Sequence, residues 1–75
     1  MTLYQIRITT EDVGQRVSLR YRTGDIPPLT DVVGELEWWE DGTLGVRRRD
    51  GALVEVEEAG LVAGRTLPTR NDELE

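Results

Sequence analysis

The sequence predicts an all-β domain, built as a small barrel of five to six strands. Apolar and polar residues alternate along several short runs, which is the period of a half-buried strand. Glycine, proline or aspartate separates these runs at short intervals, as in sandwiches and barrels. The charged side of each run also changes sign from one run to the next. Paired neighbours would therefore place arginine opposite glutamate, which favours a meandering sheet.

The chain begins with a short edge strand predicted over residues 4–8. One helical turn is expected over residues 9–12, because Thr9 and Asp12 resemble a helix-start signal and Gly14 ends it. The alternating runs then predict strands at residues 16–22, 30–40, 43–49, 52–58 and 62–67. Pro68 ends the last of them.

Alternation also assigns an inward side to each strand. The residues expected in the core are Val17, Leu19, Tyr21, Val32, Leu36, Trp38, Leu44, Val46, Val54 and Val56. Gly34 interrupts the longest run and predicts a bulge or a sharp bend there. Asp50-Gly51 between two alternating runs predicts a hairpin.

The outward sides carry the charges, in the order Arg16, Arg20 and Arg22, then Glu35 and Glu37, then Arg47 and Arg49, then Glu55 and Glu57. We expect Glu35 or Glu37 to lie across from Arg47 or Arg49. We expect the same two arginines to lie across from Glu55 or Glu57 on their other side.

The 75 residues suffice for one domain, which we place at residues 1–68, and residues 69–75 are expected to form a polar, disordered tail. A long loop, a three-strand meander, a tight turn and a last strand follow one another, which is the order of an SH3-like barrel. An OB-fold is the runner-up. It usually carries a helix between its third and fourth strands, and the short turn at Asp50-Gly51 leaves no room for one.

Composition excludes several kinds of chemistry. The chain has no cysteine and no histidine, so we expect no metal site, no cofactor and no Ser-His or Cys-His nucleophile. It has no apolar run long enough for a membrane span, and the lack of cysteine fits a cytoplasmic location. Its net charge of −6 argues against binding to phosphate backbones.

Four residues are candidates for contact with a partner: Trp39, Arg47, Arg48 and Arg49. The arginines either contact a phosphate or pair with glutamates of neighbouring strands, and the acidic total favours pairing. Arg48 points to the side opposite its two neighbours and is expected near the barrel mouth. Trp39 is either an exposed anchor or a ring packed under the loop at residues 27–28 or on the N-terminal strand. That loop lacks an aromatic residue, so a proline-rich ligand is not expected.

Residues 14–68 resemble the SH3-like N-terminal domain of actinobacterial GNAT-family acetyltransferases, a group described as histone acetyltransferases. The matching pieces, in order, are GQRV (14–17), LRYR (19–22), LTDVVGEL (29–36), LGVRRRDG (44–51), VEV (54–56) and LVAGRTLP (61–68). In that family the barrel precedes a catalytic domain that binds acetyl-CoA. No residue of this chain matches a catalytic or cofactor-binding position of that domain, so the resemblance does not carry the activity over.

The sequence therefore predicts a non-catalytic SH3-like module that contacts a protein partner or an adjoining acetyltransferase domain. The chain is either cut from a longer enzyme or a free-standing relative, and its oligomeric state stays open. The alternative is a small-barrel nucleic-acid-binding module of the KOW or Tudor-like kind, which would use residues 47–49 and an exposed Trp39.

Overall fold

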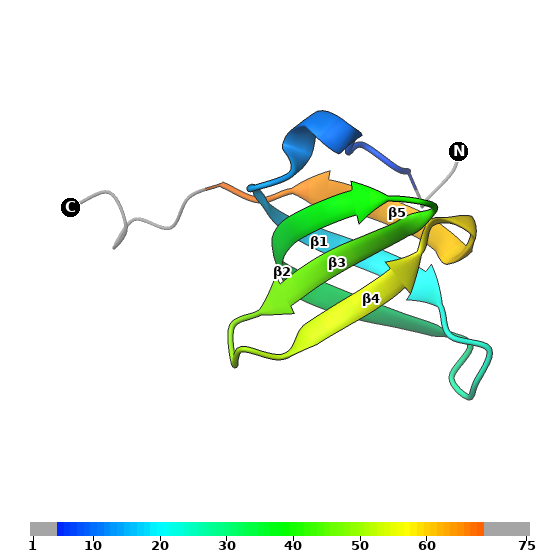
Figure 1. Ribbon diagram of the computed structural model, residues 1–75. Helices are drawn as coiled ribbons and strands as arrows, with labels where there is room; N and C mark the ends of the chain where they lie inside the picture. The colour runs from blue at the N-terminus through cyan, green and yellow to red at the C-terminus, as the bar shows by residue number, and fades with distance from the viewer. Residues whose placement is uncertain (1–4, 69–75) are drawn as a thin grey trace.

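Five antiparallel strands form one sheet that bends on itself (Figure 1). The computed structural model describes residues 5–68. Within them the elements are η1 (Thr10–Asp12), β1 (Arg16–Arg22), β2 (Leu29–Glu40), β3 (Thr43–Arg48), β4 (Leu53–Glu57), η2 (Glu58–Gly60) and β5 (Leu61–Thr66). The strand order is β4-β3-β2-β1-β5, so that the first strand pairs with both the second and the last. The prediction of an all-β small barrel is confirmed, and its five main strands lie within one residue of the predicted bounds.

The predicted edge strand over residues 4–8 is shorter than expected. Among the described residues it is reduced to one parallel bridge between Ile6 and Gly64, with Arg7 N donating to Gly64 O at 2.8 Å. Tyr4 lies outside the described residues, as does the predicted tail at residues 69–75. The helical turn is present as η1, where the Thr9 side chain accepts from Glu11 N and the Asp12 carboxylate accepts from Thr9 N.

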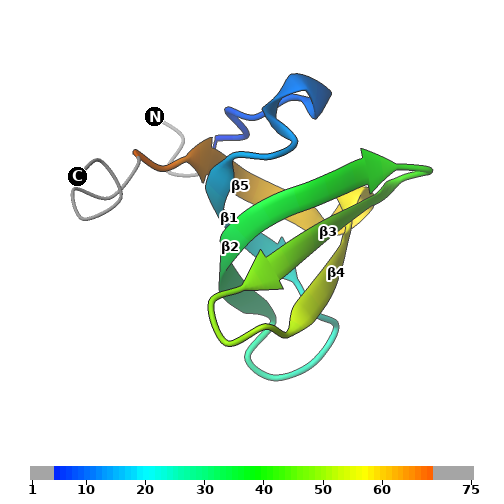
Figure 2. The same cartoon turned by 60° about the vertical axis from the view of Figure 1, so that its left-hand side comes forward.

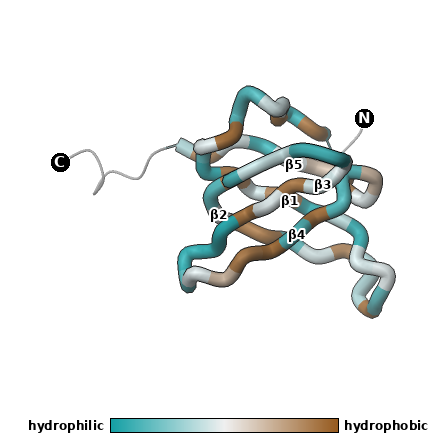
Figure 3. The backbone as a smooth tube through the Cα atoms, viewed as in Figure 1, coloured by the Kyte–Doolittle hydropathy of each residue, from teal (hydrophilic) through white to brown (hydrophobic). Residues whose placement is uncertain are grey.

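The core lies inside the bent sheet and is entirely aliphatic. Its buried residues are Ile8, Val17, Leu19, Val32, Leu36, Leu44, Val46, Val56 and Leu61, and Tyr21, Trp39 and Val54 pack against them half-buried. Brown apolar positions alternate with teal polar ones along the strands in Figure 3, as the period of two requires. Burial of each large aliphatic side chain contributes about 1.5–3 kcal/mol, so this cluster is the main source of stability.

Strand β2 joins the two halves of the sheet. Its residues 29–35 pair with β1 and its residues 34–40 pair with β3, so only Gly34 and Glu35 have partners on both sides. Figure 2 shows β2 curving between these two halves. A Cβ on Gly34 would collide with the carbonyl oxygen of Arg47, so the close approach of β3 requires glycine there.

Of the two alternatives predicted at Gly34, a bulge or a sharp bend, the bulge lies three residues later, at Glu37, whereas at Gly34 β2 passes from its pairing with β1 to its pairing with β3. Leu36 pairs with Val46 and Trp38 pairs with Gly45, so Glu37 is the extra residue between them. An extra residue shifts the alternation by one. The assignment of Trp38 to the core is therefore wrong. Its ring lies over Gly45 on the outer side of the sheet, where a Cβ on Gly45 would collide with it. Trp39 packs against the core instead.

The charge pattern is confirmed on one side of β3 and wrong on the other. Glu35 lies across from Arg47, as expected, and Arg16 lies across from Glu35 on β1. On β4, however, Leu53 and not a glutamate lies across from Arg47. The turn between β3 and β4 sets this register, because it pairs residues that lie the same number of positions before and after Asp50. Arg47 therefore lies across from Leu53, two residues before Glu55.

No helix among the described residues is long and apolar enough to cross a membrane.

Candidate functional site

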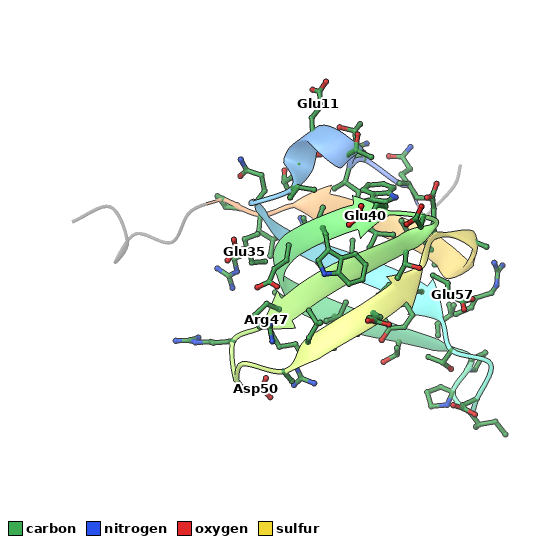
Figure 4. All side chains as sticks on the ribbon, in the orientation of Figure 1. Glu11, Glu35, Glu40, Arg47, Asp50 and Glu57 are labelled. Carbon is green, nitrogen blue, oxygen red and sulfur yellow. The ribbon has the colours of Figure 1, made fainter. Side chains whose placement is uncertain are left out.

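The three consecutive arginines lie at one end of the barrel. Arg47 and Arg48 are the last residues of β3, and Arg49 follows in the turn to β4. Arg16, the first residue of β1, lies at the same end, because Glu35 of β2 is paired with both Arg16 and Arg47. Figure 4 shows Glu35 and Arg47 at this end, near the turn that carries Asp50.

These residues surround a surface hollow of about 410 Å³, which we call the arginine groove. Its lining includes Arg16, Val33, Glu35, Arg47, Arg48 and Arg49. Leu67 also lines it, since Leu67 N donates to Arg16 O at 2.8 Å and holds the chain beside β1. A second hollow of about 500 Å³ adjoins it, shares Arg16, Val33, Arg48 and Arg49, and adds Asp31 and Asp50.

Two of the four arginines are held by carboxylates. Arg47 Nε and Nη2 donate to the two carboxylate oxygens of Glu37 at 3.1 and 3.2 Å, and Nη1 donates to Gly51 O at 3.0 Å. The hydrogen bonds that Arg47 donates to Glu37 raise the pKa of the Arg47 guanidinium above its ordinary value. Arg48 Nη2 lies 3.6 Å from Asp50 Oδ2, which is a looser pair. The bulge at Glu37 thus turns this carboxylate toward Arg47.

The other two arginines of the groove are Arg16 and Arg49. Within residues 5–68, the side chains of Arg16 and Arg49 form no ion pair. Both side chains line the arginine groove and the adjoining hollow. Sequence reasoning placed Arg16 on a charged face but did not connect it with residues 47–49. The in-register pairing of β1 with β2 is the signal that would have done so.

Trp39, the fourth predicted contact residue, lies away from this groove. Its ring packs against the core, and its Nε1 donates to Glu58 Oε1 at 2.9 Å, which ties β2 to η2. Trp38 is the indole on the outer side of the sheet, over Gly45. The two rings therefore lie on opposite sides of β2, as consecutive strand residues must.

The loop between β1 and β2 is held by hydrogen bonds among its own residues. Thr23 Oγ1 donates to Pro27 O at 3.1 Å and accepts from Asp25 N at 3.0 Å, while Thr23 N donates to Pro28 O at 2.9 Å. These bonds leave the Ile26 side chain at the tip, 98% exposed.

The arrangement supports binding by charge and apolar contact. Among the described residues, no three or more Asp and Glu side chains are grouped to hold a metal ion. Arg20 Nε and Nη2 bind the two carboxylate oxygens of Asp31 at 2.7 and 3.0 Å, and this bond lowers the pKa of Asp31. A carboxylate with a lowered pKa stays ionised at neutral pH, so Asp31 serves as an ion-pair partner.

The strand order defines a small-barrel domain, and four arginines line a surface hollow at one end of it. The chain belongs to the family described as the Rv0428c N-terminal Sm-like domain, whose model matches residues 11–65. The chain is also 44% identical over 57 residues to the probable histone acetyltransferase Rv0428c of Mycobacterium tuberculosis, a match that covers 73% of the chain and 18% of that protein. No solved structure matches the chain significantly.

The family match confirms the resemblance to an N-terminal domain of an actinobacterial protein named as an acetyltransferase. The family description uses the term Sm-like where the strand order suggested SH3-like. In either term the observed architecture is one five-stranded antiparallel sheet bent into a small barrel. The matched part of the mycobacterial protein is about a fifth of its length, so that protein's activity belongs to a chain several times longer.

Proposed function

We propose that this domain is a non-catalytic docking module of a cytoplasmic, acetyltransferase-type protein, and that it contacts an adjoining catalytic domain or another protein. The observation that carries the proposal is the arginine groove. Four arginines and one glutamate line this hollow, whereas the whole chain has a net charge of −6. A concave surface whose charge is opposite to that of the rest of the protein favours a partner with acidic groups.

The position of Leu67 supports contact with an adjoining domain. Leu67 lines the groove, and its backbone is bonded to Arg16 at the start of β1. In a longer protein of this family, the polypeptide that follows β5 would leave the barrel beside the groove. A domain attached there would meet the groove at high effective concentration, so even a weak contact would be populated.

Nucleic-acid binding is the second candidate, because arginines that form no ion pair within residues 5–68 also suit phosphates at a surface hollow. Two observations weigh against it. The net charge of −6 opposes approach of a polyanion. The two hollows also contain Glu35, Asp31 and Asp50 among the arginines, so successive phosphates would lie close to carboxylates.

The test has two parts. Calorimetry of the 75-residue chain with acetyl-CoA should show no binding, and saturable binding would contradict the non-catalytic assignment. For docking, the ¹⁵N-labelled chain is titrated with the mycobacterial relative from which the matched region has been removed. We expect the amide signals of Arg16, Val33 and Arg49 to shift, and those of Arg22 and Ile26 at the opposite end to stay in place. Absence of any shift at saturating concentration would refute docking.

A further inference from the structure

We propose that the arginine groove binds a short acidic peptide segment, whose carboxylates contact Arg16 and Arg49 and whose aliphatic side chain packs on Val33. This inference rests on the proposed docking function and identifies the chemistry of the partner segment. The groove combines two cations without an ion pair among the described residues and one exposed apolar side chain within the same hollow.

The arginines supply the anion contacts. Arg47 is held by Glu37 through two hydrogen bonds, and Arg48 lies 3.6 Å from Asp50. Arg16 and Arg49 keep their full donor sets for a ligand within the described part of the chain, and a guanidinium binds a carboxylate through two parallel hydrogen bonds. Because Arg16 begins β1 and Arg49 follows β3, the two cations come from opposite sides of β2.

Val33 supplies the apolar contact. It is 43% exposed on β2, on the outward side shared with Arg16 and Glu35, and it lines both hollows. Its directly paired neighbour on β1 is Ser18, a small side chain that does not cover it. An aliphatic side chain between two acidic residues of a ligand would therefore contact the exposed side chain of Val33, while the acidic residues contact Arg16 and Arg49.

Glu35 explains why the ligand is a peptide and not a chain of phosphates. It lies in the same cross-strand row as Arg16 and Arg47, directly between them. A nucleic acid carries a negative phosphate on every nucleotide and would place one of them against the Glu35 carboxylate. A peptide can alternate acidic and apolar residues, so its carboxylates reach the arginines while an uncharged residue passes Glu35.

The experiment uses the 75-residue chain and a fluorescein-labelled hexapeptide of alternating glutamate and leucine. Binding is followed by fluorescence anisotropy, and a peptide with glutamine in place of glutamate serves as the ligand control. The test variant is Arg16→Gln combined with Arg49→Gln. The matched control is Arg22→Gln. Arg22 is exposed, lies at the opposite end of β1 from Arg16, and forms no ion pair among the described residues.

We expect the double variant to weaken binding of the acidic peptide roughly tenfold or more, and Arg22→Gln to leave the Kd within about twofold. Val33→Ser should weaken the leucine-containing peptide but not a peptide with glycine in place of leucine. Circular dichroism checks that each variant keeps the β-sheet spectrum, so a loss of binding is not a loss of folding.

Three results would overturn the inference: equal weakening by Arg22→Gln, no discrimination between glutamate and glutamine peptides, or tighter binding of an oligothymidylate than of the acidic peptide. The outcome also separates this inference from the proposed function. If the peptide fails to bind but the truncated relative still shifts the groove amides, the acidic ligand is wrong and docking stands. If neither binds, both proposals fail.

Discussion

Replacing Gly45 with alanine tests whether the Trp38 ring lies on the outer side of β3. A Cβ at this position would overlap the indole of Trp38, so either the ring must lift or the strands must shift. Overpacking of this kind costs about 1–3 kcal/mol. In a Trp38→Ala background the obstacle is gone, and Gly45→Ala should be neutral or stabilise by about 0.5–1 kcal/mol, because alanine loses less backbone entropy than glycine. The cost of Gly45→Ala in the two backgrounds should therefore differ by roughly 1–4 kcal/mol.

The measurement is urea unfolding of the four members of this double-mutant cycle, followed by far-ultraviolet circular dichroism. Glu40→Ala provides the control background, because Glu40 is the exposed last residue of β2, the strand that carries Trp38. Gly45→Ala should keep its full cost there. Equal costs of Gly45→Ala in the wild-type and Trp38→Ala backgrounds would refute the placement of Trp38, and with it the shift of alternation at Glu37.

Three further predictions concern the core and the ion pairs. Leu36→Ala removes a fully buried side chain and should cost about 2–5 kcal/mol in urea unfolding, whereas Val33→Ala, on the exposed side of the same strand, should cost much less; similar losses would mean that the sides of β2 are exchanged. The Arg20 pair lowers the pKa of Asp31, so its contribution to stability is present above about pH 4 and should be lost as the pH falls through the folded-state value. Asp31→Asn should remove that part of the acid dependence in unfolding curves measured at successive pH values, and an unchanged dependence would contradict it. Arg47→Glu should destabilise less than Leu36→Ala, and its effect should shrink at high salt; an effect that does not change with salt would contradict an electrostatic origin.

The strands were predictable because the alternation of side chains is a local property. Residues 16–22 alternate without interruption, and β1 has the predicted bounds. Val17, Leu19, Val32, Leu36, Leu44, Val46 and Val56 are buried as expected, since burying one side of each strand leaves no other register.

The bulge was not predictable, because nothing in the local sequence distinguishes Glu37 from its neighbours. Gly34 was the conformationally permissive residue and drew the prediction, but the structure uses it for close approach to Arg47. Once an extra residue enters at Glu37, every later residue of β2 changes side, and Trp38 leaves the core. Long-range pairing decides such a shift, and alternation within one strand cannot reveal it.

The sequence predicted the arginines of the groove on β3 but not the way in which the other strands surround them. Residues 47–49 stood out as a cationic run, but their partners depend on register. The turn at Asp50 places Leu53 opposite Arg47, so Glu55 and Glu57 are not directly opposite either predicted arginine. Arg16 joins the groove only because β1 and β3 pair with the same residue of β2, a relation between segments far apart in the chain.

The pairing of β1 with β5 has a consequence for the way the domain is made. Every other ladder joins strands that are consecutive in the chain, whereas this one joins residues 17 and 66. Distant contacts form late, because the entropy of closing the intervening chain is lost before the contacts are gained. A polypeptide still attached to the ribosome can form the meander from β1 to β4. It cannot pair Leu19 of β1 with Gly64 of β5 until β5 has left the exit tunnel, so the domain completes its fold only after its last strand has emerged.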